Sequence, residues 1–129
     1  MKSKFILTTA IVTLTIGASL ALRTISYAAD EKAAPTPAQT IKGEVVDLMC
    51  YLDHGAKGEK HKGCAARCIK GGGPIGLLTS EDQLYLVVGD HAPANELLSA
   101  KAGETVSLKG KVVERNGMKM IEGAELVEK

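Results

Sequence analysis

The chain has 129 residues, of which 16 are basic and 15 acidic, and its length is that of one small domain. A formal charge of +1 gives no general attraction to nucleic acid, and one phenylalanine, three tyrosines and no tryptophan leave few rings to stack on bases.

The first 28 residues have the features of a secretory signal peptide. Lys2 and Lys4 precede an apolar run, and Ser26-Tyr27-Ala28 is a small-x-small site. We expect cleavage after Ala28, which places a mature chain of 101 residues in the periplasm or outside the cell, with no membrane attachment. An uncleaved run would instead be long enough to anchor the chain in a bilayer.

The mature chain is predicted to begin with a leader. Residues 29–40 are small and polar, which predicts a flexible segment before a domain at 41–129. The leader adds no core residue, so the domain must supply its own.

The apolar, β-branched run Ile41–Leu52 predicts the first strand. Val45 and Val46 are adjacent and break its alternation, which predicts a bulge near Gly43. Cys50 then falls at the end of this strand.

The boundaries of the later elements are marked by clearer sequence signals. Glycine and proline follow the predicted insertion helix, and Asn116-Gly117 is a strong two-residue hairpin signal. The predicted elements are a helix at His61–Lys70, strands at Ile75–Thr79 and Gln83–Gly89, a short helix within His91–Ala102 with Asn95 as its cap, and strands at Thr105–Arg115 and Met118–Val127.

This order predicts an all-β protein with short helices. The specific architecture is a five-stranded OB-like barrel with a helical insertion between strands one and two. The element order from Ile41 to Val127 and the closing pattern VSLKGKVVERNGMKMIEGAELV resemble those of small periplasmic bacterial OB-fold proteins. The cysteine-containing insertion departs from that family, and it occupies a loop that OB folds commonly use for binding.

The insertion at 49–73 holds all three cysteines and two of the three histidines. On a helix, His61, Cys64 and Cys68 lie along one face, and Cys50 reaches them from the neighbouring strand. This Cys3His set is typical of zinc sites. Soft sulfur ligands also suit cuprous copper, so either ion fits the set. His54 and Met49 are possible extra ligands. The sequence therefore predicts a small exported metal-binding protein rather than an enzyme. Its expected partners are the metal ion and a periplasmic protein.

Two alternatives use the same cysteines. A disulfide from Cys50 to Cys64 or Cys68 would fasten the insertion to the barrel of a binding module without metal. Thiol-redox chemistry is the other alternative, because the stretch is rich in lysine and nearby cations lower a thiol pKa. His91 is predicted to be an exposed turn residue, and no set of residues for hydrolytic catalysis stands out.

Overall fold

The computed structural model describes residues 36–127. The predicted signal peptide, its cleavage site and most of the predicted leader lie outside this range. Among the described residues, no helix has the length and apolar character needed to cross a bilayer.

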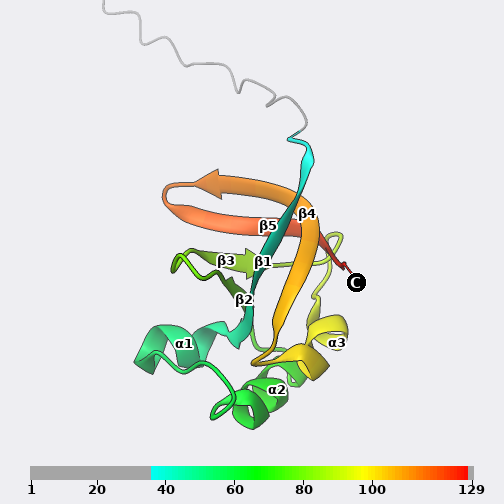
Figure 1. Ribbon diagram of the computed structural model, residues 1–129. Helices are drawn as coiled ribbons and strands as arrows, with labels where there is room; N and C mark the ends of the chain where they lie inside the picture. The colour runs from blue at the N-terminus through cyan, green and yellow to red at the C-terminus, as the bar shows by residue number, and fades with distance from the viewer. Residues whose placement is uncertain (1–35, 128–129) are drawn as a thin grey trace, which may run out of the picture. The chain divides into compact units, whose positions relative to one another are not determined.

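Five strands close into a barrel in the order β1-β2-β3-β5-β4 (Figure 1). Neighbouring strands are antiparallel except β3 and β5, which run parallel through Leu86 opposite Met120 and Val87 opposite Ile121. The strands are β1 (Ala38–Asp47), β2 (Ile75–Leu78), β3 (Leu84–Val87), β4 (Thr105–Arg115) and β5 (Met118–Leu126). The predicted five-stranded barrel with a helical insertion is therefore confirmed.

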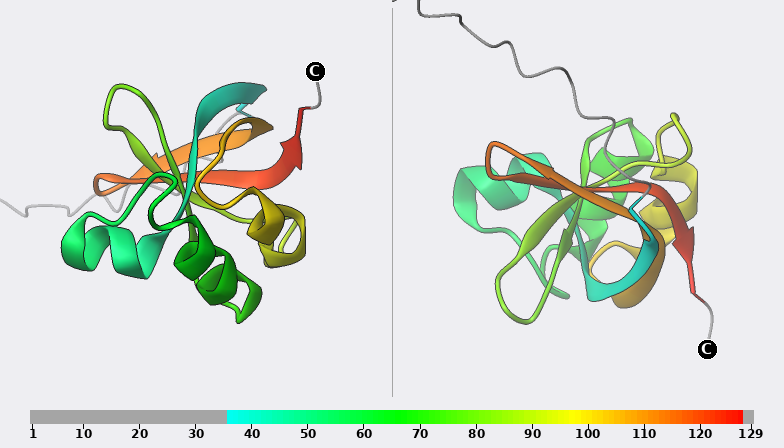
Figure 2. Two further views of the ribbon diagram at one scale, coloured as in Figure 1. Left: turned by 60° about the horizontal axis from the view of Figure 1, so that its bottom comes forward. Right: turned by 90° about the horizontal axis from the view of Figure 1, so that it is seen from above.

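The helices gather at one end of the barrel (Figures 1 and 2). Two helices form the insertion between β1 and β2, and the others connect β3 to β4. They are α1 (Leu48–His54), α2 (Lys62–Lys70), α3 (Asn95–Leu98) and the 3-10 helix η1 (Ser99–Lys101).

The predicted first strand is wrong at both ends. β1 begins at Ala38, inside the predicted leader, where Ala38 pairs with Lys111 of β4. It ends at Asp47, whose side chain accepts a hydrogen bond from the Cys50 backbone N–H and so caps a helix. Cys50 therefore lies on α1 and not on a strand.

The bulge also lies elsewhere. β1 keeps its register through Val45 and Val46. Both valines are buried, Val45 in the core cluster and Val46 near Leu48 of α1, over Gly76. The register shift falls instead between β4 and β5, beside Gly123, whose φ is +63°.

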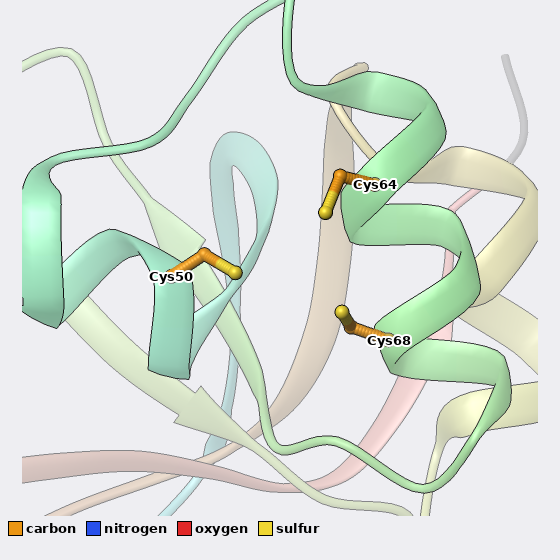
Figure 3. A group of neighbouring side chains, drawn as sticks. All are labelled: Cys50, Cys64 and Cys68. Carbon is orange, nitrogen blue, oxygen red and sulfur yellow. The ribbon is translucent and has the colours of Figure 1, made fainter.

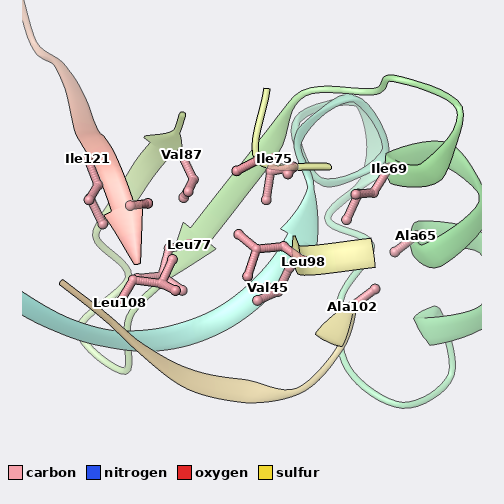
Figure 4. Packing of buried hydrophobic residues seen from close by; sticks show 12 residues of the cluster. Val45, Ala65, Ile69, Ile75, Leu77, Val87, Leu98, Ala102, Leu108 and Ile121 are labelled. Atoms are coloured by element: carbon pink, nitrogen blue, oxygen red, sulfur yellow. The ribbon is translucent and has the colours of Figure 1, made fainter. Parts of the chain in front are cut away.

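One core cluster fills the barrel and continues into the helical end (Figure 4). Ala65 and Ile69 of α2 and Leu98 of α3 belong to the same cluster as the strand residues. The members are Val45, Ala65, Ile69, Ile75, Leu77, Val87, Ala94, Leu98, Ala102, Leu108, Ile121 and Ala124. The inward side of the insertion is thus part of the domain's core. Its three cysteines do not belong to this cluster.

Candidate metal centre

The position of Cys50 is set by the start of α1. The Asp47 carboxylate accepts a hydrogen bond from the Cys50 N–H through Oδ1 at 2.9 Å, and Leu48 is buried beneath the first turn. At the other end His54 occupies the last turn, and Gly55 closes the helix at φ +70°. One short helix therefore carries both Cys50 and His54.

The positions of Cys64 and Cys68 are set by the buried side of α2. Ala65 and Ile69 enter the core, which turns the cysteine-bearing side towards α1. Figure 3 shows the Cys50 side chain pointing from α1 towards α2, with Cys64 and Cys68 directed into the same space. The i, i+4 spacing thus places two thiols of one helix opposite a third.

The end of α2 is tied to α3 by Asn95. Its Nδ2 donates to the Ile69 carbonyl at 2.6 Å and to the Gly73 carbonyl at 2.8 Å. The predicted capping role is wrong, because Asn95 is the first residue of α3 and its amide is used by these two carbonyls instead. This bond pair fixes the helix that carries Cys68.

Three sulfur atoms meet between the helices. The Sγ atoms of Cys50, Cys64 and Cys68 lie within 4.8 Å of one another, and each residue is half-buried. Sulfurs bound at about 2.3 Å to a tetrahedral zinc ion lie about 3.8 Å apart. A contraction of at most about one ångström would therefore close these thiols around an ion.

A second group shares Cys50. Its Sγ and one ring nitrogen each of His54 and His61 also lie within 4.8 Å of one another. The two ring centroids are 5.6 Å apart at 70°. His61 precedes α2 as its N-cap residue and is not within the helix as predicted, while His54, an extra ligand in the prediction, is a full member of this group.

The surroundings of two of the thiols raise their pKa. The Asp47 carboxylate, by hydrogen bonding and by its charge, raises the pKa of Cys50 to about 12, with burial contributing. Burial, followed by the neighbouring Cys64, raises the pKa of Cys68. These directions oppose the thiol-redox alternative, which requires a lowered pKa.

Asp47 is the residue that sequence reasoning missed. It is 1% exposed, and its Oδ2 has no hydrogen-bond partner in the described part of the chain. The available signal was an aspartate three residues before Cys50, the spacing at which a capping side chain reaches a backbone N–H.

The other candidate residues, Met49 and His91, are exposed. Met49 is 66% exposed, and no disulfide joins the cysteines, which are all free thiols. His91 is confirmed as an exposed turn residue, with 85% of its side chain accessible beside Asp90 and Glu122.

No protein family, characterised protein or solved structure matches this chain. Thiols and imidazoles are the donors that soft and borderline transition metals prefer. The arrangement between α1 and α2 can therefore hold such an ion, provided that the thiol protons are released.

Proposed function

We propose that this chain is a small exported protein that binds a transition-metal ion, zinc or cuprous copper, through Cys50, Cys64 and Cys68. The observation that carries the proposal is the approach of three sulfurs, from two helices, to within 4.8 Å. Export is supported by the basic, apolar and small-residue pattern of the first 28 residues.

The donor set selects the class of metal. Three thiolates can hold cuprous copper without another ligand, because soft sulfur donors suit that ion. Zinc needs a fourth ligand, for which His61 is the candidate in the Cys3His set and water the alternative. Hard cations such as magnesium prefer oxygen donors, so they are poor competitors here.

The helices do not need the ion to hold them in place, which favours reversible binding over a purely structural role. α2 is fixed by Ala65 and Ile69 in the core and by the Lys62–Glu104 ion pair at 2.9 Å. α1 is fixed by buried Leu48 and by the Asp47 cap. The ion therefore enters a preformed site at the surface of a complete domain.

Metal analysis and thiol counting test the proposal. The reduced chain should bind zinc or copper stoichiometrically and show three titratable thiols after denaturation in chelator. Cys64→Ser should abolish tight binding while the far-UV circular dichroism of the barrel is kept. His91→Ala, an exposed histidine away from the thiols, should bind as wild type does.

Two results would contradict the proposal in different ways. A single titratable thiol with no metal would establish the disulfide-containing alternative. An exported form whose N-terminus, read by mass spectrometry, is Met1 rather than Ala29 would contradict signal cleavage.

A further inference from the structure

Cys50 belongs to both donor groups, and the two groups together offer more ligands than one ion takes. Its Sγ lies within 4.8 Å of the sulfurs of Cys64 and Cys68 and also of ring nitrogens of His54 and His61. Zinc in proteins is almost always four-coordinate, so these five donors exceed the set for one ion. A thiolate keeps lone pairs after binding one ion and can bind a second.

The histidine side of the centre has an unsatisfied donor. The Nε2 atom of His61 is buried and has no hydrogen-bond partner within residues 36–127. Buried polar atoms without partners are rare, and an ion bound at this nitrogen would satisfy it. The His54 ring, at 5.6 Å and 70° from that of His61, comes from the opposite helix and can supply a second nitrogen.

We infer that the centre binds two divalent ions of the zinc type that share the Cys50 sulfur. The first ion is held by Cys50, Cys64 and Cys68, and the second by Cys50, His54 and His61. Each ion keeps a position for water or another donor, which is compatible with exchange. This inference rests on the proposed function, since the first ion is the one described there, with water and not His61 as its fourth ligand.

Titration of the reduced, metal-free chain with zinc chloride tests the stoichiometry. We expect two zinc ions per chain by elemental analysis after removal of weakly bound metal. The double variant His54→Ala/His61→Ala should bind one, and Cys64→Ser should lose the ion of the three-cysteine group. The control His91→Ala removes an exposed imidazole outside both groups and should keep two.

The outcomes separate the two proposals. One ion in the wild type, unchanged in the double histidine variant and lost in Cys64→Ser, would overturn the second ion and leave the first. No zinc in the wild type, with no copper either, would overturn both. In the cadmium-113 form, two resonances with mutual coupling support the shared sulfur, whereas two uncoupled resonances would overturn the bridge.

Discussion

Asp47 links the backbone of the domain to the chemistry of the centre. One oxygen of its carboxylate caps the N-terminus of α1, and the same carboxylate raises the pKa of the Cys50 thiol to about 12. A metal ion entering the centre therefore displaces protons from thiols that would otherwise keep them. The metal affinity of the site is therefore expected to depend on pH.

The pH dependence has a definite sign. Because the pKa of Cys50 is about 12 and that of Cys68 is also raised, both are protonated at neutral pH, and zinc affinity should rise with pH. Each proton released contributes about a tenfold rise in apparent affinity per pH unit. Competition with a chromophoric chelator between about pH 6 and about pH 8 measures this slope. A pH-independent affinity would contradict the proton release inferred from these two pKa values.

Gly73 is required by close contacts at the same carboxylate. A Cβ there would lie 2.8 Å from the buried Asp47 Oδ2 and 2.9 Å from the Cys68 carbonyl oxygen. We expect Gly73→Ala to destabilise the protein by about 1–3 kcal/mol, as overpacking does. Denaturant unfolding in the presence of chelator measures this.

Gly63 provides the matched control for that substitution. It lies within α2, and a Cβ there would meet no atom within 4 Å. Gly63→Ala should therefore stabilise the protein by up to about 1 kcal/mol, because alanine is the better helix former. Equal effects of the two substitutions would show that the contacts of Gly73 do not matter.

Among the helices and strands, the bounds were predicted best where the turn residues and the hydrophobic pattern indicate the same boundary. Thr105–Arg115 was predicted to its observed bounds, because alternation is clear and Asn116-Gly117 supplies both positive φ values of the turn. The end of α2 at Lys70 was equally clear from the glycines that follow.

The start of the insertion was not predictable from hydrophobic pattern. The run from Val45 to Leu52 is apolar except for Asp47, and a buried strand and a helix look alike in so short a stretch. Asp47 changes the structure there by capping. This error affects only part of the predicted centre. The three cysteines converge as predicted, but Cys50 lies on a helix, and the same helix places His54 near Cys50.

The ion pair between Lys62 of α2 and Glu104, the residue before β4, tests how α2 is held in place. Lys62, and to a lesser extent Lys101, lowers the pKa of Glu104, while Glu104 raises the pKa of Lys62. The Glu104 contribution is present above the pKa of the unfolded carboxyl and is lost as pH falls through its lowered folded value. The Lys62 contribution is lost only as pH rises through its raised folded value. Both are therefore present at neutral pH.

We expect Glu104→Gln to be modestly less stable than wild type at neutral pH, since the pair is only partly buried and screened by salt. The difference should vanish in acid below the folded pKa of Glu104. Urea unfolding across this range measures it. A difference that persists in acid would assign the loss to packing and not to charge.

For the whole molecule, the separation of core and centre is the main feature. The barrel and α2 share one apolar cluster, while the thiols occupy the space between the two insertion helices (Figures 3 and 4). An OB-like barrel can therefore carry this centre in its first loop without giving up core residues. Two neighbouring residues of α2, Cys68 and Ile69, lie on opposite sides of this division.

Substituting each of these two residues tests the separation. Ile69 is fully buried, so Ile69→Ala should lower the free energy of unfolding of the metal-free protein by about 2–5 kcal/mol. Cys68→Ala should leave the metal-free stability close to wild type but abolish tight metal binding. Chemical denaturation in chelator and elemental analysis measure the two effects on the same samples. If Cys68→Ala also unfolded the metal-free domain, the thiols would be part of the core, and an exchangeable ion in a preformed site would be the wrong description.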